Sequence, residues 1–206
     1  MKKFINKKFI IVTALALLLF VTVGSTLAYI FTKTEPVENT FNPSKVACAV
    51  VEDGGAPVTG DNKYIDAKKT NVKIKNTGDT TAYIRVAVIV NWMSADGSKV
   101  WAAKPTSDKY TIKYILGAYG WLDGGDGYYY YSKPVAPKDS TSILIEEAKL
   151  NDGVTGPVGT DKTQYYLSIE IVASAIQSTP TSVVTDQWLT GGNIAVGEDG
   201  ILKPAN

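Results

Sequence analysis

Apolar and polar side chains alternate with a period of two in several runs of this chain, and this pattern constrains the fold more than any other feature of the sequence. The clearest runs have their apolar members at Val72 and Ile74, at Ile84, Val86, Val88 and Val90, and at Tyr165, Leu167, Ile169 and Ile171. Successive side chains of a β-strand point to opposite faces of its sheet. One face of each strand is therefore expected to be buried and the other exposed to solvent, as is typical of antiparallel sheets.

Stretches rich in β-branched and aromatic residues recur along the chain, with turn residues between them. The expected strands are 45–51, 71–75, 82–92, 110–116, 128–131, 140–145 and 164–175. Little other helix is expected beyond one short segment at residues 181–189, and the glycine-rich residues 191–206 are expected to be a flexible C-terminal tail. Many short strands with frequent turns indicate an all-β fold, an antiparallel β-sandwich of jelly-roll or immunoglobulin-like type.

The chain contains no histidine and a single cysteine, Cys48. The lack of histidine excludes a Ser-His-Asp triad and histidine-ligated zinc, and one cysteine excludes an intramolecular disulfide. We therefore predict a protein that is not an enzyme, with no catalytic, cofactor-binding or metal-binding residues. Cys48 lies in an apolar run and is expected to be a small core residue, the alternatives being an intermolecular disulfide or a reactive thiol. The net charge of +1 gives no reason to expect a nucleic-acid partner.

The N-terminus has the three-part layout of a secretory signal peptide. Four lysines precede an apolar run over residues 9–23, and small residues follow. The apolar run is shorter than the ~20 residues that a membrane-spanning helix needs. We predict that residues 1–28 form a signal helix that signal peptidase removes during export, with Thr26 at the −3 position, Ala28 before the cut and Tyr29 as the new N-terminus. An uncleaved anchor is the alternative.

Three stretches together carry a family resemblance. The first is the cleavage region at residues 24–32, and the second runs from Thr34 to Val46 into the first expected strand. The third joins Lys-Ile-Lys-Asn-Thr-Gly-Asp at residues 73–79 to Ala-Tyr-Ile-Arg-Val at residues 82–86. These stretches resemble the TasA/camelysin-like secreted proteins of Gram-positive bacteria, whose signal peptides are processed by the SipW type of signal peptidase. The resemblance implies a jelly-roll-like sandwich, export to the cell surface or medium, and a role in extracellular fibres or biofilm matrix.

In the best-known relatives, the segment freed by signal cleavage inserts as a strand into the next subunit. By that resemblance, residues 29–41 are the candidate donor strand, with apolar side chains at Tyr29, Phe31, Val37 and Phe41. Strand addition would supply backbone hydrogen bonds and side-chain pockets. Pro36 argues against one continuous central strand, because proline has no N–H to donate. The alternative is that this segment pairs within its own domain or is a flexible terminus.

An aromatic-rich region and a glycine-rich run could be binding sites, but each can also be explained as ordinary strand or turn structure. The aromatic residues Trp92, Trp101, Trp121 and Tyr128 to Tyr131 could stack on sugars, or could be divided between the core and the surface by ordinary strand alternation. The glycine-rich run 123–127 has two acids, too few for a calcium site, and is best interpreted as a hairpin turn.

The predicted organisation is a signal peptide at 1–28, a donor segment at 29–41, a sandwich domain at 42–190 and a tail at 191–206. The predicted function is an exported structural subunit of extracellular fibres or biofilm matrix that binds copies of itself. The alternative is a monomeric secreted module that binds carbohydrate, such as cell-wall or matrix polysaccharide, or another component of the cell surface. A camelysin-like peptidase ranks third, since a zincin needs two histidines.

Overall fold

In this computed structural model, eight of the ten described strands form two four-stranded antiparallel sheets. The structure describes residues 44–53, 68–118 and 120–205, which lie in one structural unit, Ser44–Asn206. The first sheet has the order β1 (Cys48–Asp53), β2 (Lys69–Asn76), β7 (Ile145–Leu150) and β4 (Tyr110–Tyr114). The second has the order β5 (Trp121–Asp123), β6 (Tyr129–Tyr131), β3 (Ala82–Ser94) and β8 (Tyr165–Gln177).

The remaining elements follow β8 in the chain. They are α2 (Ser182–Trp188) and a two-stranded hairpin of β9 (Ile194–Val196) and β10 (Leu202–Pro204). Strands account for 47% of the described residues and helix for 5%. The expected all-β class with antiparallel sheets is therefore confirmed. Among the described residues, no helix has the length and apolar character needed to cross a membrane.

The largest hydrophobic cluster draws its side chains from both four-stranded sheets. Its fully buried members include Val72 and Ile74 of β2, Ile84 and Val86 of β3, and Ile145 of β7. The apolar members of the alternating run in β8 also belong to it, with Leu167 and Ile169 buried and Ile171 packed against them. The period-two pattern in the sequence therefore identified the buried face of β2, β3 and β8 correctly.

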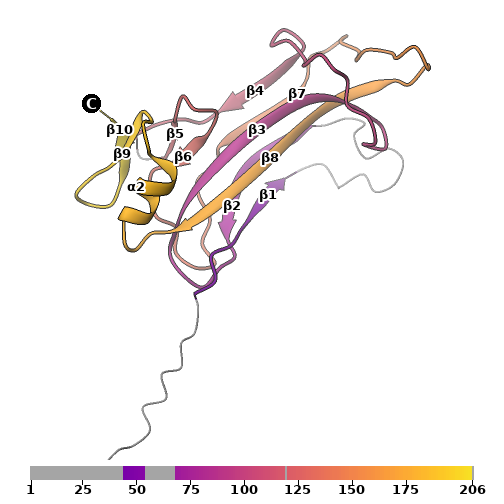
Figure 1. Ribbon diagram of the computed structural model, residues 1–206. Coiled ribbons are helices and arrows are strands. Elements are labelled where there is room, and N and C mark those ends of the chain that lie inside the picture. Colours follow the sequence, from indigo (N-terminus) through magenta and orange to yellow (C-terminus); the bar gives the residue numbers. More distant parts are fainter. Residues whose placement is uncertain (1–43, 54–67, 119, 206) are drawn as a thin grey trace, which may run out of the picture. The chain divides into compact units, whose positions relative to one another are not determined.

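A second hydrophobic cluster lies on the other face of β3 and β6. Tyr83 and Tyr130 point into it from the sheet, opposite to the neighbouring core residues Ile84 and Val86. Val184 of α2, Ile194 of β9 and Leu202 of β10 cover these two tyrosines and are among the most buried members of the cluster. Figure 1 shows α2, β9 and β10 beside β5 and β6. The C-terminal elements therefore form a cap over this end of the second sheet, which we call the C-terminal cap.

Two expectations from the sequence are wrong. Residues 191–206 were expected to be a flexible tail, but β9 and β10 pair with each other and bury Ile194 and Leu202 against the sheet. Residues 140–145 were expected to be a strand, but the regular strand there is β7, which begins at Ile145. Before it, the chain follows β2 irregularly, with Thr141 N and Leu144 N donating to β2 carbonyls.

Candidate functional site

The open edge of β8 is the most distinctive surface feature for a protein expected to act by contact. β8 has 13 residues and is the outermost strand of its sheet, paired along its whole length with β3. Figure 1 shows the two strands side by side. No described strand is hydrogen-bonded to the other side of β8, so within the described residues the backbone groups on that side from Leu167 to Gln177 have no strand partner.

The direction of each backbone group of β8 follows from two hydrogen bonds near its ends. Ser178 N donates toward β3, to Thr81 O at 3.0 Å, whereas Tyr165 N donates away from β3, to Pro157 O at 3.0 Å. Backbone groups alternate in direction along an antiparallel strand. The N–H groups of the odd-numbered residues, such as Ile171 and Ala173, therefore point to the open side.

The other outer strands are less suited to accept a partner. β1 has 6 residues, a register shift between Val51 and Asp53, and a Glu52–Lys69 ion pair at 2.9 Å. β4 has 5 residues and a register shift at Lys113 and Tyr114, and β5 has only 3. Short length, bulges and charges protect sheet edges from pairing. β8 has none of these features apart from one charged residue, Glu170.

The turn between β2 and β3 fixes the point where the chain enters the domain. Thr77 N and Gly78 N donate to Ala47 O, and Asp79 N donates to Lys45 O at 3.0 Å. A carboxylate oxygen of Asp79 accepts from Lys45 N at 2.6 Å. The residues just before β1 are thus held by four hydrogen bonds to this turn.

The buried Asn76 side chain shapes that turn. Its Nδ2 donates to Thr80 O and Val135 O, each at 2.8 Å, and its Oδ1 accepts from Gly78 N at 2.9 Å. A Cβ atom on Gly78 would lie 2.3 Å from Lys45 O, so only glycine fits there. The Asn-Thr-Gly-Asp motif that carried part of the resemblance is therefore a structural anchor for residues 45–47.

The predicted cleavage and donor residues lie outside the described part of the chain. These are Thr26, Ala28, Tyr29, Phe31, Val37 and Phe41. The open edge of β8 is a site that the sequence reasoning did not locate, since strand order in a sheet cannot be deduced from alternation alone.

The structure does not gather the aromatic residues into one exposed platform. Trp92, Trp121 and Tyr130 are buried, and the indole nitrogen of Trp121 donates to Ser142 O at 2.9 Å. Tyr129 stacks on Tyr114 with ring centroids 4.6 Å apart, and burial raises the pKa of Tyr114, helped by a hydrogen bond with Tyr129. Strand alternation divides the tyrosines of β6 between the two hydrophobic clusters.

Arg85, the only arginine in the sequence, lies in an aromatic cage. Its guanidinium carbon is 4.1 Å from the ring centroid of Tyr128 and 4.4 Å from that of Trp188. Burial raises the pKa of the neighbouring Tyr130 to about 12, supported by its hydrogen bond to Asp126 at 2.7 Å. A cation between two aromatic faces is held by its attraction to the ring quadrupoles. Arg85 therefore ties β3 to the C-terminal cap.

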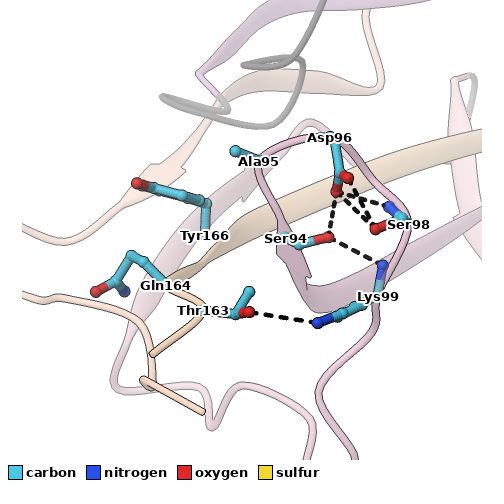
Figure 2. Close-up of a pocket in the computed structure, with 8 residues that line it drawn as sticks. All are labelled: Ser94, Ala95, Asp96, Ser98, Lys99, Thr163, Gln164 and Tyr166. Carbon is cyan, nitrogen blue, oxygen red and sulfur yellow. Dashed lines mark hydrogen bonds between the residues drawn. The ribbon is translucent and has the colours of Figure 1, made fainter. Parts of the chain in front are cut away.

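A polar pocket of about 390 Å³ lies where the turn after β3 meets the segment leading into β8. Figure 2 shows the residues that line it, which are Ser94, Ala95, Asp96, Ser98, Lys99, Thr163, Gln164 and Tyr166. Lys99, one of these lining residues, also forms an exposed ion pair, with its Nζ 2.6 Å from Asp161 Oδ2. Sequence reasoning missed this pocket, because its walls come from segments more than sixty residues apart in the chain.

The remaining sequence predictions concern a turn and a thiol. Residues 123–127 connect β5 to β6, with Asp123 and Asp126 each accepting a backbone hydrogen bond within the turn, as expected for a hairpin. Cys48 on β1 is half-buried against the main hydrophobic cluster, and burial raises the pKa of its thiol. Within the described residues, no group of three or more acidic or cysteine side chains could hold a metal ion.

Three features therefore characterise the site: the open side of β8 from Leu167 to Gln177, an anchored entry to β1 and a separate polar pocket. Comparison with known proteins adds no further assignment. A scan of protein-family models, a search of curated proteins and a search of solved structures each gave no match to this chain.

Proposed function

We propose that this protein is an exported structural subunit of extracellular fibres or matrix, in which residues 29–41 of one subunit add as a strand to β8 of the next. The observation that carries the proposal is the open edge of β8. A long, regular and nearly uncharged edge strand is a template for pairing with another chain, and natural proteins that keep such an edge commonly use it for strand addition.

The proposal includes a specific architecture for the domain. We infer that the two four-stranded sheets pack face to face as a sandwich of jelly-roll type. Support comes from the main hydrophobic cluster, which contains side chains of β2 and β7 from one sheet and of β3 and β8 from the other. Sheets that share one core in this way are the usual solution for an all-β domain.

The donor segment is long enough to cover the acceptor edge, and its apolar candidates share one face. Residues 29–41 number 13, and the open side of β8 runs over the 11 residues from Leu167 to Gln177. The apolar candidates Tyr29, Phe31, Val37 and Phe41 all have odd numbers, so an extended strand would place them on one face, together with the polar residues Lys33, Glu35 and Asn39. Four buried side chains at about 1.5–3 kcal/mol each would contribute roughly 6–12 kcal/mol before the cost of association.

Pro36 is compatible with antiparallel addition to β8. The odd-numbered residues of β8 direct both their side chains to the core and their N–H groups to the open edge. Residues that face each other across an antiparallel ladder have side chains on the same face of the sheet. Odd-numbered donor residues, whose side chains would point to the core, would therefore be the ones whose backbone groups bond to β8. Pro36 is even-numbered, so its nitrogen would point away from β8 and no hydrogen bond to β8 would be lost.

Electron microscopy of the secreted protein tests the mechanism. Protein that begins at Tyr29 is expected to form fibres, and protein that begins at Asn42 is expected not to. N-terminal sequencing of the secreted form is expected to give Tyr29 first. Fibres from the form that lacks residues 29–41 would rule out the donor segment.

A proline on β8 tests the acceptor edge. Ala173→Pro removes an N–H that points to the open side and leaves the bonds to β3 in place, so the domain should fold but not polymerise. Ala173→Ser is the matched control and should assemble normally. Fibres from the Ala173→Pro variant with an unchanged unfolding temperature would show that β8 is not the acceptor.

A further inference from the structure

We propose that the polar pocket at the start of β8 binds a saccharide with neutral or amino-bearing sugar units. This goes beyond subunit assembly. The pocket is lined by the end of β3 and the turn after it, and by Thr163, Gln164 and Tyr166, whereas strand addition uses the backbone edge from Leu167 onward. Its volume of about 390 Å³ falls within the range of about 300–1,000 Å³ typical of small-ligand sites.

The polar groups of the pocket are already held in place. Asp96 Oδ1 accepts from Ser94 Oγ at 2.6 Å, from Ser98 Oγ at 2.9 Å and from Ser98 N at 3.0 Å. Ser94 Oγ in turn accepts from Lys99 N at 2.9 Å. Figure 2 shows this network on one side of the pocket and Thr163 on the other. A ligand would therefore meet hydroxyl and carboxylate groups that need little further ordering, which lowers the entropic cost of binding.

The opposite wall adds a hydroxyl group and an aromatic ring. Lys99 Nζ is 3.4 Å from Thr163 Oγ1. Gln164 is fixed by its amide nitrogen, which donates to Gly156 O at 3.0 Å. The partly exposed Tyr166 presents an amphipathic ring, apolar on its face and polar at its tip. A sugar also combines apolar C–H faces with hydroxyl groups, so this mixed lining matches it better than a purely apolar ligand.

The charge of the pocket selects among sugars. The lining holds one carboxylate, Asp96, and one ammonium group, Lys99. Because Lys99 is already paired with Asp161, which lies outside the lining, the Asp96 carboxylate leaves a local charge of about −1. An acidic ligand such as a uronate or a phosphate would be repelled. A neutral sugar would meet only hydrogen-bonding groups, and an amino sugar would gain an ion pair with a carboxylate.

Titration calorimetry with three soluble oligosaccharides tests the proposal on the secreted protein. The probes are a glucose tetramer, a glucosamine tetramer and a galacturonate tetramer. We expect heat of binding with the neutral or the amino oligomer, and the stronger of these two identifies the sugar type. The galacturonate oligomer is expected not to bind. Binding of the acidic oligomer alone, or of none of the three at millimolar concentration, would overturn the proposal.

Variants place the binding in the pocket. Tyr166→Ala is expected to weaken binding at least tenfold, while Tyr166→Phe, which keeps the ring, should bind nearly normally. Thr163→Val should weaken binding several-fold, and its matched control is Thr181→Val, at an exposed threonine outside the pocket. Circular dichroism checks each fold. Unchanged affinity in both Tyr166→Ala and Thr163→Val would exclude this pocket. Ala173→Pro should still bind sugar, so failure of strand addition and failure of sugar binding are distinguishable.

Discussion

At the residue scale, single side chains and one glycine determine the conformation of two turns. One is the turn between β2 and β3 that holds the residues before β1, and the other is the turn after β3 that lines the pocket. Asn76 is fully buried and makes three hydrogen bonds with the chain around it. A buried amide with satisfied bonds specifies one conformation, and the same amide without them would be costly. Sequence reasoning identified the Asn-Thr-Gly-Asp run as a turn, but the partners at Lys45 and Val135 could not be foreseen because they are distant in the chain.

Replacing Gly78 should destabilise the domain because the entering chain passes directly beside it. In Gly78→Ala the new Cβ would meet Lys45 O at 2.3 Å and Ala47 N at 2.9 Å, so the backbone must shift. We expect a loss of about 1–3 kcal/mol in the free energy of unfolding, measured in urea. Gly117→Ala, where a Cβ would meet nothing within 4 Å, is the control and should change little. Equal stability of both variants would contradict the anchor.

The carboxylate of Asp96, which lines the pocket, should make the stability of the folded domain depend on pH below about pH 4. Hydrogen bonds from Ser94 and Ser98 lower the pKa of Asp96 from 3.8 to about 2. The unfolded chain then binds the proton more readily, so the stabilisation is complete above pH 4 and is lost as the pH falls toward 2. Asp96→Asn should make the unfolding temperature depend less on pH between 4 and 2, and Ser98→Ala should have a smaller effect of the same kind. Part of the dependence should remain, because the pKa of Asp161 is also lowered to about 2. An unchanged slope in Asp96→Asn would contradict this assignment.

At the element scale, the strands that alternation predicted well are those whose buried face lies in the shared core. β3 and β8 were expected at 82–92 and 164–175 and extend only slightly further, to Ser94 and Gln177. β7 was misplaced because its residues Glu146 and Glu147 look like solvated surface in the sequence. In the structure, Glu147 lies near Lys68, Lys113 and Lys149, so its counter-charges come from the residue before β2, from β4 and from β7 itself.

The aromatic cage should make Arg85 important for attachment of the C-terminal cap. Arg85→Lys keeps the charge but loses the planar group that lies between the rings of Tyr128 and Trp188. We expect about 1–3 kcal/mol of destabilisation from contacts with two rings, and at least as much in Arg85→Ala. Trp188 fluorescence and urea unfolding report the effect. Lys104→Ala, at an exposed lysine, is the control. A fully stable Arg85→Ala variant would show that the cage does not hold the cap.

At the scale of the whole domain, the C-terminal residues are a packed part of the fold and not a flexible tail. Their glycines, among them Gly197 and Gly200, suggested a loose segment, but these residues shape the connection between β9 and β10. Tyr83 Oη donates to Gly200 O at 2.7 Å, and Leu202 N donates to Ser132 O at 2.7 Å. The signal that could have revealed the hairpin was the isolated pair of Ile194 and Leu202 within this glycine-rich sequence.

Truncating a buried side chain of the hairpin should therefore destabilise the whole domain. Leu202 is fully buried in the second cluster, whereas its neighbour Lys203 is exposed. We expect Leu202→Ala to lose about 2–5 kcal/mol, a large share of the stability of a typical domain, and Lys203→Ala to lose little. Thermal unfolding followed by circular dichroism gives the comparison. Similar unfolding temperatures for the two variants would indicate that the hairpin is not part of the cooperative unit.

The rarity of arginine in this sequence has a practical consequence. An endoprotease specific for arginine has one possible target, the bond after Arg85, and that bond lies within β3 between β6 and β8. The enzyme can cut only when the second sheet opens. In protein that begins at Tyr29, a single cut would give two fragments, residues 29–85 and 86–206. The rate at which the uncut band disappears from a gel therefore reports directly how often the second sheet of this protein opens.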